Sequence, residues 1–295
     1  MEKKLKNLHP KNKFNQEYDF TRLVKKVPDL KHFLQQTPDK RVSIDFSNPD
    51  AVFYLNKALI EYGFDIKGWD ILEQSLCPSI PGRLNYIHYL ADLIGNKANK
   101  KVKILDIGTG SSLVYPILGS RTYGWSFVAT EIHQASLNHA EKILSRNPGL
   151  DKNIQLRFQE NPNQILAGVI RAGEYLDAVM CNPPFYKSKE DYLATVGKKN
   201  RKLHQVEENF HTNFKGLSNE LWCTGGEKKF ITQLITESIQ FKDQIGICSC
   251  LVSNKENLKP LKAVLEYHKI KGITVTQMHQ GNKINRILSW ELNKV

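Results

Sequence analysis

The sequence predicts an α/β fold, a Rossmann-like and mostly parallel seven-stranded sheet with a terminal antiparallel strand. Three observations support this class. Short apolar runs alternate with amphipathic stretches from residue 102 onward, as in a parallel sheet covered by helices. The turn Gly108-Thr-Gly110 follows the first apolar run. The corner Asn182-Pro-Pro-Phe185 stops the fourth run abruptly, because proline has no backbone N–H to donate within a sheet.

A small basic region, residues 1–95, precedes the predicted sheet and is expected to be mainly helical and to bind RNA. Helices are expected to begin at Asp19 and near Asp50, and a third stretch spans residues 83–94. Cations and aromatic rings alternate here, which suits RNA, since cations meet phosphates and rings stack on unpaired bases. A solvated basic tail is the alternative interpretation.

Residues 96–295 form the second predicted domain, with a charged insertion loop at residues 186–224. The pattern predicts strands at residues 102–107, 127–130, 154–158, 178–181 and 245–252, and a terminal antiparallel pair at 273–278 and 287–292. It predicts helices at residues 135–145, 164–171, 226–241 and 258–267. Long irregular insertions beside a site are often functional, so the loop is predicted to clamp a ligand.

Composition limits the partners. The formal charge of +12 predicts an anionic partner, although charge alone does not separate nucleic acid from a membrane surface or from a merely soluble basic surface. No apolar run approaches the ~20 residues of a membrane span, and the Lys-rich start lacks the apolar core of a signal peptide. Five cysteines without a CxxC pair indicate neither zinc nor disulfides. We expect a cytoplasmic monomer with no metal and no membrane partner.

The segment Asp106-Ile-Gly-Thr-Gly110 lies where a strand meets a helix. Glycines there let the backbone approach a ligand, and the helix that follows offers free N–H groups. A lone GxG is weak, and Ser112 stands where the full dinucleotide fingerprint has a third small contact. Glu131 strengthens the prediction, because a carboxylate about twenty residues on can accept hydrogen bonds from both ribose hydroxyls.

The corner Asn182-Pro-Pro-Phe185 supplies an amide, free backbone carbonyls and a flat apolar ring at the carboxyl end of a strand, where ligands bind in open α/β sheets. These groups can hold a planar ring that bears an exocyclic amine. Together with the glycine turn and Glu131, they specify an S-adenosylmethionine-dependent methyltransferase with a class I methyltransferase fold. A Pro-Pro loop with one packed phenylalanine is the alternative.

These motifs also carry a resemblance to the bacterial 23S ribosomal RNA adenine N6-methyltransferases (the RlmF type), related to the eukaryotic small nuclear RNA adenine N6-methyltransferases. The resemblance covers nearly the whole chain. The long C-terminal extension of the eukaryotic branch is missing, which favours the bacterial substrate. The matching segments are Leu8-His-Pro-Lys-Asn12, Tyr18-Asp-Phe20, Asn85-Tyr-Ile-His88, Asp106-Ile-Gly-Thr-Gly110, Thr130-Glu131, Asn182-Pro-Pro-Phe185, Glu220-Leu-Trp-Cys223, Gly225-Gly-Glu227, Leu251-Val-Ser253 and Gln280-Gly281.

The resemblance implies which residues contact the cofactor S-adenosylmethionine. Arg83 would meet its methionine carboxylate, and either Gln164 or Asn163 would contact its adenine. The full predicted cofactor set is Arg83, Asp106, Gly108, Gly110, Glu131, Gln164 and Asn182.

The predicted reaction is direct methyl transfer to the N6 amine of an adenine in 23S ribosomal RNA. The predicted catalytic set is Asn182, Pro183, Pro184 and Phe185. Phe185 would stack on the base, while the Asn182 side-chain oxygen and the Pro183 carbonyl would accept the two amine hydrogens. The amine becomes acidic only as the new bond forms, so no general base is required. His133, His139 and His204 are accordingly expected to be solvated or helix-face residues rather than catalytic ones.

The predicted RNA-binding residues lie in the N-terminal region and in the insertion loop. They are Lys11, Lys13, Lys187, Lys198, Lys199, Arg201 and Lys202. The expected partner is 23S ribosomal RNA or a large-subunit assembly intermediate. Three alternatives stay open: the same fold acting on guanine N2 or a protein glutamine, a noncatalytic RNA-binding assembly factor, and a dinucleotide dehydrogenase, for which the Asn-Pro-Pro-Phe corner would have no purpose.

Overall fold

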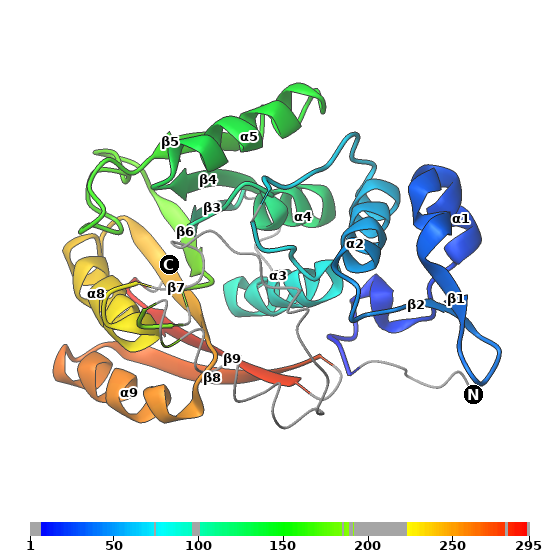
Figure 1. The fold of residues 1–295 in the computed structure, drawn as a ribbon. Coiled ribbons are helices and arrows are strands. Elements are labelled where there is room, and N and C mark those ends of the chain that lie inside the picture. Colours follow the sequence, from blue (N-terminus) through cyan, green and yellow to red (C-terminus); the bar gives the residue numbers. More distant parts are fainter. Residues whose placement is uncertain are drawn as a thin grey trace.

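The computed structural model describes residues 7–73, 75–95, 101–184, 186–188, 191, 223–280 and 283–293. One seven-stranded sheet runs through the molecule, with helices on both faces. Figure 1 shows α1, α2 and a small hairpin at one end and α8 and α9 at the other.

The sheet has the strand order β5-β4-β3-β6-β7-β9-β8. Its strands are β3 Lys103–Ile107, β4 Ser126–Glu131, β5 Ile154–Phe158, β6 Leu176–Cys181, β7 Ile245–Val252, β8 Lys271–Gln280 and β9 Lys283–Glu291. The pairs among β3, β4, β5, β6 and β7 are parallel, whereas β9 is antiparallel to both β7 and β8. The predicted fold class is confirmed, because each predicted strand overlaps one of these seven.

The N-terminal region contains more elements than the sequence indicated. They are η1 Lys13–Asn15, α1 Phe20–Lys26, η2 Pro28–Phe33, the antiparallel pair β1 Leu34–Gln36 and β2 Val42–Ile44, α2 Pro49–Phe64 and α3 Ile80–Ile94. Asp19 caps α1 by accepting the Arg22 N–H, and Asn48 caps α2. Both helix starts agree with prediction, but the β1–β2 hairpin was missed.

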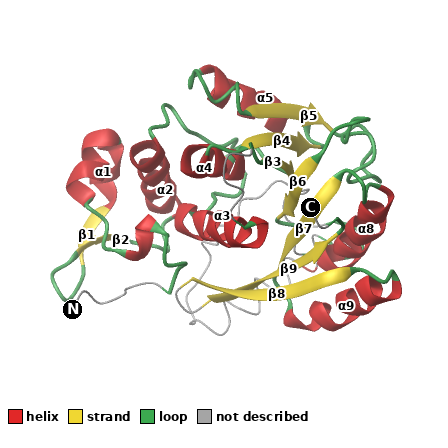
Figure 2. Cartoon of the chain, turned by 180° about the vertical axis from the view of Figure 1, so that it is seen from behind, coloured by secondary structure: helices red, strands yellow, loops and turns green. Residues whose placement is uncertain are grey.

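Strand side chains alternate between two buried clusters on the two faces of the sheet. The remaining helices are α4 Val114–Tyr123, α5 Gln134–Ser145, α8 Gly226–Gln240 and α9 Leu258–Tyr267, with the 3-10 turn η3 Lys255–Asn257 before α9. Residues of α2, α3, α4 and α5 share one cluster with Ile104 of β3, while α8 and α9 share the other with Leu105. Figure 2 shows the same arrangement from behind. Both faces are covered, which explains the near-continuous apolar sequence of the parallel strands.

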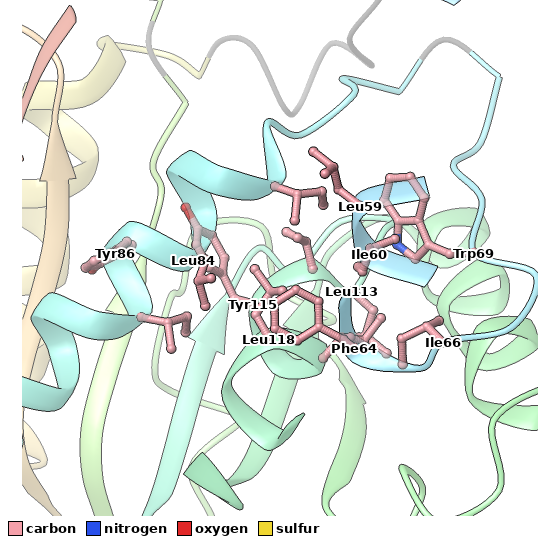
Figure 3. Packing of buried hydrophobic residues seen from close by; sticks show 14 of the residues in the cluster. Leu59, Ile60, Phe64, Ile66, Trp69, Leu84, Tyr86, Leu113, Tyr115 and Leu118 are labelled. Carbon is pink, nitrogen blue, oxygen red and sulfur yellow. The ribbon is translucent and has the colours of Figure 1, made fainter. Parts of the chain in front are cut away.

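The N-terminal helices are packed directly against the element that follows the glycine turn. Both α2 and α3 contact α4, and Figure 3 shows side chains of this region, among them Leu59 and Leu84, in one packed cluster with Tyr115 and Leu118 of α4. The buried Trp69 indole N–H also donates to the Ser112 carbonyl at 2.9 Å. The division at residue 95 stays a prediction, although this shared core ties the two regions together.

The predicted helix over residues 164–171 is wrong. The chain forms turns there, and Gly168 has a φ of +83°, which lies outside the helical range. The N–H groups of Ile165, Leu166 and Ala167 donate to the carboxylate of Glu237, seventy or more residues away. These N–H groups would be free in the first turn of a helix, so Glu237 satisfies them in the turn, and the left-handed Gly168 keeps the chain from continuing as a helix.

Candidate active site

The ends of three neighbouring strands bring the three sequence motifs to one edge of the sheet. Ile107 of β3 is paired with Thr130 of β4 on one side and with Cys181 of β6 on the other. The residues that follow these three, Gly108, Glu131 and Asn182, therefore leave the sheet at the same level. This carboxyl edge is where open α/β sheets bind ligands.

The turn after β3 needs glycine at two positions. Gly108 and Gly110 have φ values of +68° and +66°, in the left-handed region that side chains disfavour. A Cβ at Gly108 would meet nothing within 4 Å, so the backbone conformation rather than crowding requires glycine there. The Thr109 N–H donates to the Thr130 carbonyl at 2.9 Å and the Gly110 N–H to Glu131 Oε2 at 3.0 Å, which fixes the turn against β4.

The Glu131 carboxylate already accepts three backbone hydrogen bonds. Oε1 accepts from the N–H groups of Ile132 at 2.8 Å and His133 at 3.1 Å, and Oε2 accepts the single bond from Gly110. A carboxylate offers about four acceptor positions, so Oε2 has the larger free capacity for a ligand hydroxyl. Burial raises the pKa of Glu131, while its backbone donors oppose the rise.

Asp106 lies below the glycine turn and does not line the cavity. Its side chain is buried, and neither carboxyl oxygen reaches a partner in full hydrogen-bonding geometry among the described residues. Burial raises the pKa of Asp106 to about 7, partly offset by the Thr109 hydroxyl beside it. Its predicted contact with the cofactor remains a prediction.

Arg83 brings a cation to the cavity from the first turn of α3. Its Nη1 donates to the Tyr115 hydroxyl of α4 at 2.8 Å, which orients the guanidinium. No carboxylate of the described residues lies within 4 Å of it. Burial raises the pKa of Tyr115 to about 12, so this phenol stays neutral beside the arginine. Arg83 can therefore pair with an anionic group of a ligand.

The corner after β6 presents an unsatisfied acceptor. Asn182 Oδ1 is buried and has no hydrogen-bond partner among the described residues, although Asn182 lines the cavity. Pro184 lines the cavity too, and Pro183 is buried behind it. Phe185 lies outside the described residues. Because an unpaired buried polar atom is costly, Asn182 Oδ1 is suited to receive a donor from a ligand.

The cavity at this edge encloses about 430 Å³, the size of a small-molecule site. It brings together all the predicted cofactor residues except Asp106. Several lining residues were not nominated from sequence, and three of those named next come from α8. They are Leu76, Pro78, Ile132, Gln159, Cys223, Thr224, Lys229, Phe230 and Gln233. The spacing of Lys229 and Gln233, four residues apart on one helical face, was the available signal.

The predicted RNA-binding lysines are placed differently from one another. Lys11 is exposed, with its ammonium 3.4 Å from Asp92. The Lys13 ammonium lies 3.7 Å from the centre of the Phe64 ring and donates to the Gly63 carbonyl, and burial lowers its pKa. Lys13 is thus committed to the end of α2. Lys187 is exposed and lies against Gly226 at the start of α8. Lys198, Lys199, Arg201 and Lys202 lie outside the described residues.

His133 and His139 lie among the described residues, and neither lines the cavity. His133 Nδ1 lies 3.1 Å from the Ser136 hydroxyl, and His139 Nδ1 donates to the Ser111 carbonyl at 3.0 Å. His204 is outside the described residues.

Within the described part of the chain no helix is long and apolar enough to cross a membrane. Those same residues contain no group of three or more His, Cys, Asp or Glu suited to a metal ion.

Comparison with known proteins places this chain beside RNA methyltransferases. A family model described as RNA methyltransferase matches residues 2–294. Ribosomal RNA large subunit methyltransferase F of Shewanella denitrificans is 44% identical over 298 residues, covering 97% of this chain and 83% of that protein. The protein of the same name from a Psychrobacter species is 42% identical over 301 residues, covering 96% and 92%.

Two solved structures agree over nearly the whole chain. The hMettl16 catalytic domain in complex with MAT2A 3'UTR hairpin 1 has a TM-score of 0.84 and 32% identity, covering 97% of this chain and 96% of that one. The N-terminal domain of human METTL16 in complex with SAH has a TM-score of 0.78 and 30% identity, covering 97% and 98%.

Proposed function

This chain belongs to the RNA methyltransferase family, and from that membership we propose that it methylates the exocyclic N6 of one adenine in 23S ribosomal RNA. S-adenosylmethionine is its cofactor. The large-subunit assignment is supported by relatives named ribosomal RNA large subunit methyltransferase F. The observation that carries the proposal for an amine is the buried, unpartnered Asn182 Oδ1 at the cavity.

The donor groups of the cavity fit the cofactor. Arg83 has no described acidic partner and would pair with the methionine carboxylate. Glu131 Oε2 would accept a ribose hydroxyl, since it has a free acceptor position. Gln164 or Asn163, on the turn after β5, would contact the adenine. When bound, S-adenosylmethionine supplies a methyl group activated by a positively charged sulfur.

The corner after β6 would hold the acceptor base. Asn182 Oδ1 and the Pro183 carbonyl accept the two hydrogens of the amine, which aims the nitrogen lone pair into the cavity. Phe185 stacks on the ring, and Pro184 keeps the corner stiff. The target adenine must leave its stack to enter. Positioning then supplies much of the rate, and the proton of the methylated amine is released to water.

The test is transfer of labelled methyl from S-adenosylmethionine to purified large-subunit RNA, followed by nucleoside analysis. Labelled N6-methyladenosine is the expected product. Label on guanine would replace the proposed base, and label on an added protein would replace RNA as the substrate. Cofactor binding without transfer to free RNA would point to a large-subunit assembly intermediate. Absence of cofactor binding would favour a noncatalytic RNA-binding role.

Glu131→Gln is expected to weaken binding of S-adenosylhomocysteine by about 10- to 100-fold, because a hydrogen bond to a charged acceptor is replaced by a neutral one. Whichever way the amide turns, its NH2 group meets a backbone N–H, either of Gly110 or of Ile132 and His133. Isothermal titration calorimetry measures the change. Glu141→Gln, at an exposed position of α5, is the matched control. Equal affinities for the two variants would contradict the assigned role.

The insertion loop is proposed to contact RNA phosphates through Lys198, Lys199 and Arg201. Reversing these three charges is expected to weaken RNA binding. The slope of the logarithm of the affinity against the logarithm of the salt concentration should become shallower by up to about 2, because each phosphate contact on a single strand contributes roughly 0.7. Binding titrations at several salt concentrations measure the slope. Reversal of the exposed Lys142 on α5 is the control. An unchanged slope would remove the loop from the RNA interface.

We propose that the enzyme works as a monomer in the cytoplasm, where a ribosomal RNA substrate is made in bacteria. The choice between free 23S ribosomal RNA and an assembly intermediate follows from the transfer experiment.

A further inference from the structure

We propose that Glu237 of α8 is a positioning residue that shapes the adenine end of the cofactor cavity. It does not line the cavity itself. It acts through the turn after β5, whose residues Asn163, Gln164 and Ile165 do line it. The inference rests on the cofactor assignment of the proposed function but not on the identity of the RNA.

The Glu237 carboxylate gathers three consecutive backbone N–H groups of this turn. Oε2 accepts from Ile165 at 2.9 Å, Leu166 at 2.7 Å and Ala167 at 3.3 Å, and Oε1 also accepts from Ile165 at 3.1 Å. Hydrogen bonds to an ionised acceptor are roughly twice as strong as neutral ones. One side chain of α8 thereby fixes the course of the turn.

Gln233, one helical turn earlier on α8, extends this support. Its Nε2 donates to Glu237 Oε1 at 2.7 Å and to the Asn163 carbonyl at 2.6 Å. On the other side of the turn, Gln159 Nε2 donates to the Ala167 carbonyl at 2.9 Å. The turn is therefore held from both ends, yet Glu237 is the only anion among these described partners.

The position of the turn makes it the adenine end of the cavity. Arg83 and the glycine turn after β3 mark the methionine end, and Glu131 at the end of β4 marks the ribose. The turn after β5 comes next along the sheet edge, because β5 is paired with β4. A base attached to a ribose at Glu131 would thus extend toward residues 163–165. Fixing this turn in advance reduces the ordering cost of cofactor binding.

Glu237→Gln removes the charge while keeping the shape. It is expected to weaken S-adenosylhomocysteine binding by about 10- to 100-fold and to raise the cofactor KM similarly, with kcat at saturating cofactor within about threefold of the parent. In the cofactor-free protein, the amides of Ile165, Leu166 and Ala167 should exchange with solvent at least about tenfold faster, while those of β7 are unchanged. Glu237→Asp keeps the charge but is one methylene shorter, so it should reach fewer of the three N–H groups and show intermediate losses of affinity and of exchange protection.

These measurements are made on the full chain. Calorimetry gives the affinity, mass spectrometry follows the hydrogen exchange, and steady-state kinetics gives KM and kcat. Glu266→Gln, at an exposed position of α9, is the matched control and should match the parent. Unchanged affinity and unchanged exchange in Glu237→Gln would overturn the proposal, as would a loss of kcat with unaltered affinity. If Glu237→Gln does not fold, Glu237→Asp decides: parental exchange and affinity overturn the proposal, and faster exchange with weaker binding supports it. Binding of S-adenosylhomocysteine is measured without RNA, so these results do not depend on whether the rRNA assignment is correct.

Discussion

Asn182→Ala is expected to lower the methyl-transfer rate constant by about 10²- to 10³-fold, the cost of removing one group aimed at the reacting atom. The truncation removes the amide oxygen that would orient the amine, and nothing else among the described residues points an unpartnered acceptor into the cavity from the corner after β6. The methyl donor and the RNA surface are left in place. Single-turnover transfer with saturating cofactor and RNA measures the effect on the chemical step.

The same variant should bind S-adenosylhomocysteine within about tenfold of the parent, since Arg83 and Glu131 carry charged contacts that it retains. Asn138→Ala, at an exposed position of α5, is the control and should transfer methyl at the parental rate. A transfer rate in Asn182→Ala within a few-fold of the parent would exclude the amide as the group that holds the amine. Loss of cofactor binding in step with the rate would instead make Asn182 a cofactor residue alone.

Glu174→Gln is expected to lower the free energy of unfolding by about 3–5 kcal/mol, because it breaks a buried ion pair and leaves one charge without compensation. The Arg157 guanidinium meets both Glu174 oxygens at 2.6 and 2.7 Å, and the two side chains are 8% and 7% exposed. Lys103 Nζ adds a third contact to Glu174 at 2.7 Å. Denaturant titration should show a lower midpoint with an unchanged slope. Glu141→Gln on the surface of α5 is the control.

The same ion pair predicts how stability depends on pH. Hydrogen bonds and the charge of Arg157 outweigh burial and lower the pKa of Glu174 to about 2 in the folded protein. A depressed pKa contributes stability that is complete above the unfolded value of about 4.3 and is lost as pH falls toward 2. The parent should therefore lose stability over that window more steeply than Glu174→Gln. Parallel pH profiles would show that the pair is not the source of acid sensitivity.

The sequence alone determined the fold class, the strand ends that carry the site and the type of cofactor. Those features are local: an apolar run predicts a buried strand, glycines permit the backbone of a turn, and two prolines end a strand after Asn182. In a parallel sheet the carboxyl ends share one edge, so the convergence of Gly108, Glu131 and Asn182 follows from their positions after three strands. Similarity along the whole chain then supplied the family.

Only the tertiary structure decided what lies between these strand ends. Residues 164–171 have a helical pattern, yet they form a turn whose N–H groups are held by the distant Glu237 carboxylate. Lys13 has the composition of an RNA contact, but its ammonium lies on the Phe64 ring. In both cases the partner is distant in sequence, and a pattern of neighbouring residues carries no information about it. Burial is also decided by the tertiary structure. Asp106 was predicted to contact the cofactor because of its motif, whereas its raised pKa depends on the core that surrounds it.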